Sequence, residues 1–230
     1  MGRMMRCNTP TLLESAKMFV GRRFFRAGRL AALGLACLFA ITAATAATKT
    51  VLFYGDSLTA GYGLDPDEGY PALIQEKIDA AGLGWRVVNA GLSGETTAGG
   101  LRRLDWILRQ RVDVFVIELG GNDGLRGIAP ELTRQNLETM IERIRAKSPD
   151  VTIVIAGMQI PTNMGPDYAE AFAKIFPAVA KKHGAVLIPF LLEGVGGVPE
   201  LNLPDGIHPT AEGHRIVAET VWRYVKPLLQ

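Results

Sequence analysis

The chain has 230 residues, of which 48% are apolar, 21% charged and 7% aromatic. This composition excludes a disordered tail, a collagen-like repeat and a membrane protein of many helices. Residues 47–230 hold 18 Lys and Arg against 22 Asp and Glu, a formal charge of −4, so they lack the basic surface that nucleic-acid binding requires.

The N-terminal segment, residues 1–46, has the order of a secretory signal peptide. Four arginines between residues 22 and 29 precede the uncharged run 30–41, and small side chains follow, with Ala44 and Ala46 spaced as a signal peptidase site. We therefore expect cleavage near Ala46 and export to the periplasm or the medium. The alternative is an uncleaved membrane anchor, because residues 30–47 form an 18-residue stretch without charge.

Both cysteines, Cys7 and Cys37, lie in this leader. The mature chain would therefore contain no disulfide, no cysteine nucleophile and no cysteine metal ligand, although an exported protein is free to form disulfides. The domain must be held by its own core, for which about 180 residues are sufficient.

From residue 51 onward, short apolar runs alternate with amphipathic segments. The runs rich in Val and Ile predict strands at 51–54, 87–88, 112–119, 151–156 and 186–188. Apolar residues spaced at three and four predict helices over 71–81, 98–109, 131–146, 168–182 and 211–229. This alternation predicts one doubly wound α/β domain over residues 47–230, with about five parallel strands and helices on both faces.

Functional groups of such sheets gather beyond the carboxyl ends of the strands. The first predicted strand is followed by Gly55-Asp56-Ser57-Leu58, in which the Ser57 hydroxyl is either a helix N-cap or a presented nucleophile. The second is followed by Ser93-Gly94-Glu95-Thr96, where Gly94 either brings a backbone N–H close to a ligand or serves the loop alone. Both interpretations remain open for each motif taken singly.

The third strand is followed by Gly120-Gly121-Asn122-Asp123. Asn122 either presents its amide beyond the strand or forms a turn with its own backbone. Near the C-terminus, Asp205-Gly206-Ile207-His208-Pro209 places a carboxylate three residues before an imidazole. An Asp205 carboxylate bonded to Nδ1 of His208 leaves Nε2 outward as a base, the arrangement that a serine nucleophile needs.

The other two histidines, His183 and His214, are expected at the surface or at helix ends. A metal site formed by Asp205, His208 and His214 is an alternative, but the chain has no short-spaced histidine pair or His-Glu-x-x-His motif.

Taken together, these four motifs resemble those of the SGNH, or GDSL, hydrolase superfamily. The chain is most similar to its bacterial exported branch of acyl-CoA thioesterases, lysophospholipases and arylesterases, and the likeness covers essentially all of residues 47–230. The resemblance implies a flavodoxin-like SGNH fold and a serine hydrolase of esters or acyl thioesters. It implies Ser57 as nucleophile, His208 as general base, Asp205 as its orienting carboxylate, and Ser57, Gly94 and Asn122 as oxyanion donors.

Neither a metal nor an organic cofactor is needed for that chemistry. The expected binding partner is a small acyl-bearing ester or thioester substrate. We expect a monomer without a stable protein partner. The candidates for an apolar acyl groove follow or border the strand ends, although each is equally well a core residue: Leu125, Ile128, Ile160, Leu191 and Leu192. Three alternatives remain: a carbohydrate acetyl-esterase, a catalytically silent lipid- or glycan-binding module, and a flavodoxin-like nucleotide binder, which lacks a phosphate-binding glycine motif.

Overall fold

The computed structural model describes residues 48–161 and 164–230. The predicted leader therefore lies outside the described residues. Within them, no helix combines the length and the apolarity needed to cross a bilayer.

Five parallel strands form one sheet in the order β2-β1-β3-β4-β5, which confirms the predicted doubly wound α/β class. The strands are β1 (Thr50–Gly55), β2 (Arg86–Asn89), β3 (Val114–Glu118), β4 (Thr152–Ala156) and β5 (Val186–Ile188). All residues of β1 and β3 are buried, because helices cover both faces of these central strands.

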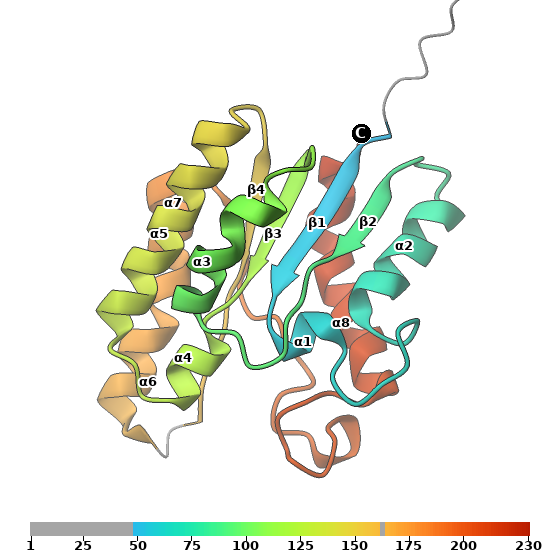
Figure 1. Cartoon of the computed structure of the whole chain (residues 1–230). Coiled ribbons are helices and arrows are strands. Elements are labelled where there is room, and N and C mark those ends of the chain that lie inside the picture. Colours follow the sequence, from blue (N-terminus) through green and yellow to red (C-terminus); the bar gives the residue numbers. More distant parts are fainter. Residues whose placement is uncertain (1–47, 162–163) are drawn as a thin grey trace, which may run out of the picture. The chain divides into compact units, whose positions relative to one another are not determined.

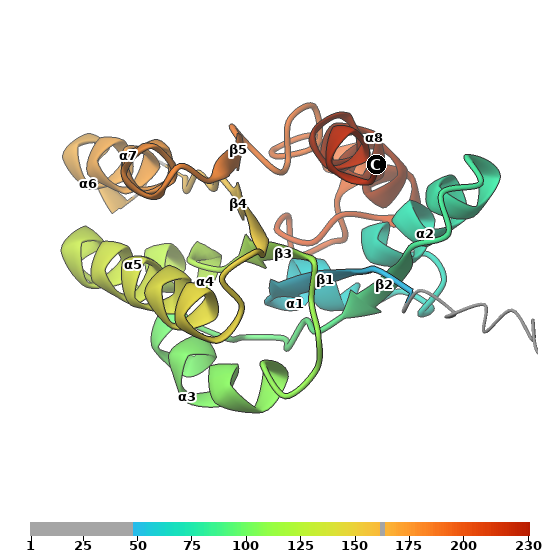
Figure 2. The ribbon, with the colours of Figure 1, turned by 90° about the horizontal axis from the view of Figure 1, so that it is seen from above.

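The longer helices are α2 (Tyr70–Ala80), α3 (Thr97–Ile107), α5 (Pro130–Lys147), α6 (Pro166–Ala173), α7 (Ile175–His183) and α8 (Ala211–Val225). Figure 2 shows α2 and α8 together on one face of the sheet, and α3, α5 and α7 on the other. Each helix turns its apolar stripe inward, as Ile74 and Ile78 of α2 illustrate by their complete burial.

The predicted helix over 168–182 is interrupted. The structure has α6 and α7 in its place, joined at Lys174. Pro177 explains the break, because its ring lacks an N–H and clashes with the carbonyl four residues earlier, that of Ala173. The last predicted helix also ends early: α8 stops at Val225, and the 3₁₀ turn η3 (Lys226–Leu228) contains Pro227.

The carboxyl ends of the parallel strands lie along one edge of the sheet. Two short helices that the periodicity did not predict, α1 (Ser57–Ala60) and α4 (Gly121–Leu125), follow β1 and β3 at this edge. Figure 1 shows α1, α4 and the loop between β5 and α8, which includes the 3₁₀ turn η2 (Pro199–Leu201), gathered there. All four sequence motifs are therefore carried to one edge of the sheet.

Candidate active site

The turn after β1 decides between the two interpretations of Ser57. Asp56, not Ser57, is the N-cap of α1, and its Oδ1 accepts a hydrogen bond from the backbone N–H of Leu58 at 3.0 Å. The Ser57 hydroxyl is consequently not used as a cap. Its Oγ instead lies 2.8 Å from Nε2 of His208.

The loop before α8 brings His208 to that hydroxyl. Oδ2 of Asp205 lies 2.7 Å from Nδ1 of His208, while Oδ1 accepts the backbone N–H groups of Ile207 at 2.9 Å and His208 at 3.0 Å. Gly206 permits this tight turn because its φ is +69°, which L side chains rarely adopt. The structure therefore brings Ser57, His208 and Asp205 into one hydrogen-bonded row.

Hydrogen bonds set the charge of Asp205. Donation from the backbone N–H of His208, from its ring and from the backbone N–H of Ile207 lowers the pKa of Asp205 to about 2. The carboxyl is accordingly ionised at neutral pH and holds the proton of the neutral imidazole on Nδ1, so that Nε2 is the acceptor facing Ser57.

Asn122, the second residue of α4, lies across the same site. Its Nδ2 donates to Oδ2 of Asp56 at 3.0 Å, which leaves the second hydrogen of that amide for another acceptor. The neighbouring Asp123 accepts the backbone N–H of Thr97 at 2.8 Å, and so ties α4 to α3. These side chains therefore bond partners on other elements, and the turn interpretation of this motif is wrong.

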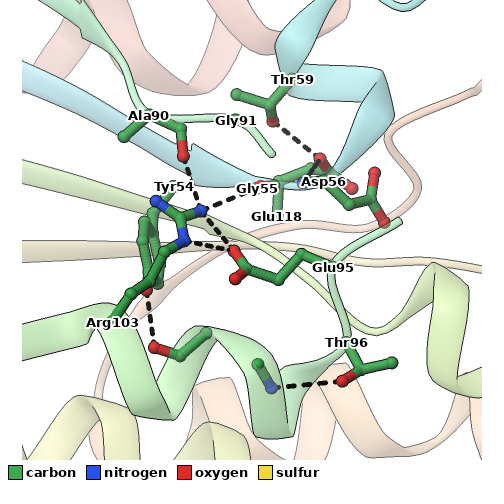
Figure 3. A network of polar contacts seen from close by, with 12 residues as sticks. Tyr54, Gly55, Asp56, Thr59, Ala90, Gly91, Glu95, Thr96, Arg103 and Glu118 are labelled. Carbon is green, nitrogen blue, oxygen red and sulfur yellow. Dashed lines mark hydrogen bonds and ion pairs between the residues drawn. The ribbon is translucent and has the colours of Figure 1, made fainter. Parts of the chain in front are cut away.

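The loop after β2 is held by Arg103, which extends from α3 (Figure 3). Arg103 pairs with Glu95, donates to the carbonyl of Ala90 at 2.7 Å and places its guanidinium 4.1 Å from the ring centroid of Tyr54. The loop that carries Gly94 is thus anchored on both sides. Gly94 itself has φ +79°, a conformation that favours glycine.

A cavity of about 560 Å³ opens over these groups, and Ser57, Gly94, Asn122 and His208 line it. Its size is that of a small-molecule site. Much of its remaining wall is apolar and comes from Leu125, Met158, Ile160, Phe190, Leu192 and Ile207.

Two of the five predicted groove residues are not part of this wall, which corrects the prediction for them. Leu125 and Ile160 line the cavity, but Ile128 and Leu191 do not. Leu191 is only 1% exposed and packs in the core, because its backbone N–H is bonded to the carbonyl of Gly157 and the side chain turns inward. Its neighbour Leu192, also a predicted groove residue, does line the cavity.

Sequence reasoning missed Tyr62 at this site. Its ring lies 4.4 Å from that of His208, with 38° between the planes, and it lines the cavity while remaining half exposed. Tyr62 follows the left-handed residue Gly61 that ends α1. No spacing in the sequence connects it to a histidine 146 positions away.

His214 does not lie at the surface as expected. It is 1% exposed, its Nδ1 accepts the backbone N–H of Tyr70 at 3.1 Å, and the two rings stack. Burial, reinforced by the nearby His208, lowers the pKa of His214 to about 4. Among the described residues, no group of three or more His, Cys, Asp and Glu side chains is placed to hold a metal.

Comparisons with known proteins agree with this geometry. The family described as GDSL-like Lipase/Acylhydrolase matches residues 53–216. Esterase TesA of Pseudomonas aeruginosa is 46% identical over 185 residues, which cover 80% of this chain and 91% of the relative. Thioesterase 1/protease 1/lysophospholipase L1 of Escherichia coli K12 is 37% identical over 84% of this chain and 90% of the relative. The crystal structure of TesA superimposes with a TM-score of 0.75 at 46% identity, covering 78% of this chain and 99% of that one.

Proposed function

This chain belongs to the GDSL-like lipase/acylhydrolase family and is a serine hydrolase of ester or acyl thioester bonds, and from that premise we propose which residues perform the reaction. Ser57 is the nucleophile, His208 the general base and Asp205 the residue that orients the imidazole. The observation that carries this assignment is the pair of contacts of His208, 2.8 Å to the Ser57 hydroxyl and 2.7 Å to the Asp205 carboxylate.

In the first step, Nε2 of His208 takes the hydroxyl proton as Oγ of Ser57 attacks the carbonyl carbon. The tetrahedral intermediate then collapses, the bond to the leaving oxygen or sulfur breaks, and His208 returns its proton to the leaving group. In the second step, His208 activates a water that hydrolyses the acyl-Ser57 ester. The Asp205 carboxylate stabilises the imidazolium formed in each step.

Three donors face the developing oxyanion. Ser57 occupies the first position of α1, where a backbone N–H has no acceptor within its own helix. Gly94 supplies a second backbone N–H, and Asn122 supplies the amide hydrogen that Asp56 does not hold. Each oxyanion donor of this kind is typically worth about 10²–10³ in rate.

The substrate class follows from the wall of the cavity. An apolar wall favours an acyl chain over the hydroxyl groups of a sugar, because the latter would lose their hydrogen bonds to water there. We therefore expect hydrolysis of p-nitrophenyl esters and acyl thioesters to improve as the acyl chain grows from two carbons until the cavity is filled. Fastest turnover of acetylated xylan would favour the carbohydrate esterase instead.

The test of the assignment is the pair formed by the wild type and Ser57→Ala. A fluorophosphonate should inactivate the wild type and add the mass of one phosphonyl group on the peptide that contains Ser57. Ser57→Ala should remain folded, as circular dichroism would show, and lose nearly all turnover of p-nitrophenyl esters. Full activity in that variant would refute the assignment.

We also propose that residues 1–46 are an export leader, and the order of basic, apolar and small residues supports this. Expression of the whole chain in a bacterium should yield a periplasmic protein whose intact mass is that of a chain starting at Ala47. A protein found only in the membrane fraction, with residues 30–47 retained, would support the anchor instead.

A further inference from the structure

One buried carboxyl beside the site has no part in the proposed chemistry. Glu118 is the last residue of β3, pairs in register with Gly55 of β1 and is 0% exposed. Its Oε2 accepts hydrogen bonds from the Thr59 hydroxyl at 2.7 Å and from the backbone N–H of Asp56 at 3.2 Å (Figure 3). Glu118 therefore holds both ends of the turn that contains Ser57.

The first sequence motif is built around this carboxyl. A Cβ placed on Gly55 would lie 2.4 Å from Oε2 of Glu118 and 2.1 Å from the Thr59 hydroxyl, closer than real atoms approach. Glycine is required at residue 55 because Glu118 and Thr59 occupy the space of its side chain. The glycine of the first motif is therefore needed because Glu118 lies against it.

Asp56 connects Glu118 to the reacting groups. Its backbone N–H is held by Glu118, its Oδ2 accepts the amide of Asn122 at 3.0 Å, and Ser57 is the next residue. A displacement of the Glu118 carboxyl would therefore reach both the nucleophile and the third oxyanion donor. Glu118 itself does not line the cavity, so substrate does not contact it.

The surroundings of Glu118 disfavour a negative charge on it. Burial and the neighbouring Asp56 carboxyl raise the pKa of Glu118 well above its usual range. Its Oε1 is buried without a hydrogen-bond partner among the described residues, and the Thr59 hydroxyl that bonds Oε2 has Tyr70 as its other partner. Arg103, the cation in the same network, pairs with Glu95 instead.

We propose that Glu118 is a positioning residue that works as a neutral carboxylic acid, holding the turn over residues 56–59 so that Ser57 and Asn122 face the substrate. This inference rests on the roles proposed for Ser57 and Asn122. A neutral acid at residue 118 needs no counter-ion in the core, and it leaves Asp56 as the carboxylate that accepts the amide of Asn122.

Two substitutions separate the neutral acid from a required charge. Glu118→Gln keeps the shape and the acceptor oxygen but cannot ionise, so kcat for a p-nitrophenyl ester should stay within about threefold of wild type. Glu118→Ala leaves the Asp56 N–H without an acceptor and leaves the Thr59 hydroxyl with Tyr70 as its remaining partner. It should lower kcat about 10²-fold, the cost of misplacing reacting groups by about 1 Å, with KM nearly unchanged.

The pH dependence of kcat/KM gives a readout that does not depend on the alanine variant folding. If Glu118 stays neutral throughout turnover, its replacement by Gln, which cannot titrate, removes no titration from the profile. Glu118→Gln should therefore keep the acid limb and the alkaline limb of the wild-type profile. The titratable groups around this network are Asp56, Tyr70, Glu95, Arg103 and the two histidines His208 and His214, and all are retained in the variant. A profile that loses a limb would show that Glu118 titrates during turnover and would overturn the proposal.

Glu138→Gln is the matched control. Glu138 is also a buried glutamate, but it lies on α5 and pairs with Arg134 and Lys182, so its substitution should lower Tm without changing kcat. The proposal is overturned if Glu118→Gln is as slow as Glu118→Ala, if folded Glu118→Ala matches wild type, or if only KM changes. Activity retained in Ser57→Ala would refute the proposed function instead, and that measurement keeps the two failures apart.

Discussion

The turn after β1 and the loop before α8 each place an aspartate beside the reacting groups, in opposite environments. Asp56 is 2% exposed, and burial raises its pKa to about 6, although the hydrogen bonds that it accepts act to lower the pKa. The Asp205 side chain is 38% exposed, and hydrogen bonds lower its pKa to about 2. The turn that carries the nucleophile is therefore anchored in the core of the domain, whereas the loop that carries the base is anchored at its surface.

The two carboxyls consequently affect stability with opposite signs. Native Asp56 binds its proton more tightly than the unfolded chain, so its contribution to the free energy of unfolding falls as pH rises from 3.8 to about 6. Asp205 binds its proton less tightly when folded. Its contribution is complete above pH 3.8 and is lost as pH falls through about 2.

The largest effect expected on the surface side is that of His208→Ala. Removal of a general base should lower kcat about 10³- to 10⁴-fold. Because the loop over 203–210 is only partly buried, Tm should change by less than about 3 °C. Steady-state kinetics and thermal unfolding would measure both, and a large fall in Tm would show that the loop is part of the core after all.

On the core side, Asn122→Ala should lower kcat about 10²- to 10³-fold with little change in KM, because its hydrogen bond strengthens in the transition state. Asn136→Ala is a matched control, since Asn136 lies on α5 and donates to the Thr97 hydroxyl at 3.0 Å, away from the cavity. An effect of Asn122→Ala on KM alone would argue against an oxyanion role.

A smaller effect is expected from Asn202→Ala, which tests how the surface loop is held. Nδ2 of Asn202 donates to the carbonyls of Val195 and Val198, both at 2.7 Å, and the residue forms a β-bridge with Pro209. Loss of these buried bonds should lower Tm by about 3–10 °C and kcat by about tenfold. An unchanged Tm would mean that two backbone bonds are sufficient to hold the loop, from the Leu203 N–H to the carbonyl of His208 at 2.7 Å and from the Thr210 N–H to the carbonyl of Leu201 at 2.9 Å.

The sequence predicted the sheet and all four motifs, because buried strands and strand-end loops leave local patterns. It did not predict which side chain of a loop faces the cavity, because Leu191 and Leu192 were equal candidates and only Leu192 lines it. The break at Pro177 and the burial of His214 could both have been predicted from the sequence. His214 shares its helix face with Val217, Val221 and Val225, and this spacing of three and four indicates a buried face. The prediction instead followed the polarity of the imidazole ring and placed His214 at the surface.

Other features have no local signal. The contact of Tyr62 with His208 and that of Glu118 with Asp56 join segments far apart in the chain, and only the folded sheet brings them together. Glu118 ends a run of five residues that are all buried, where an acid would ordinarily mark the end of the strand. Its role depends on filling the space that a side chain at residue 55 would take, and the spacing of apolar residues in the sequence does not indicate such a contact.

The smallest effect on catalysis is expected from His214→Gln, which sharpens the distinction between the two histidines near the site. Glutamine also offers an acceptor to the Tyr70 N–H, and native His214, with a pKa of about 4, is neutral during turnover. The kcat/KM profile should therefore keep its wild-type shape above about pH 5.5. Stability should differ instead, because unfolded His214 takes up a proton below pH 6.5 and native His214 does not until about pH 4. Wild-type Tm should thus fall more steeply than that of the variant between these values. A shifted acid limb of kcat/KM in the variant would mean that His214 contributes to the pH dependence of turnover.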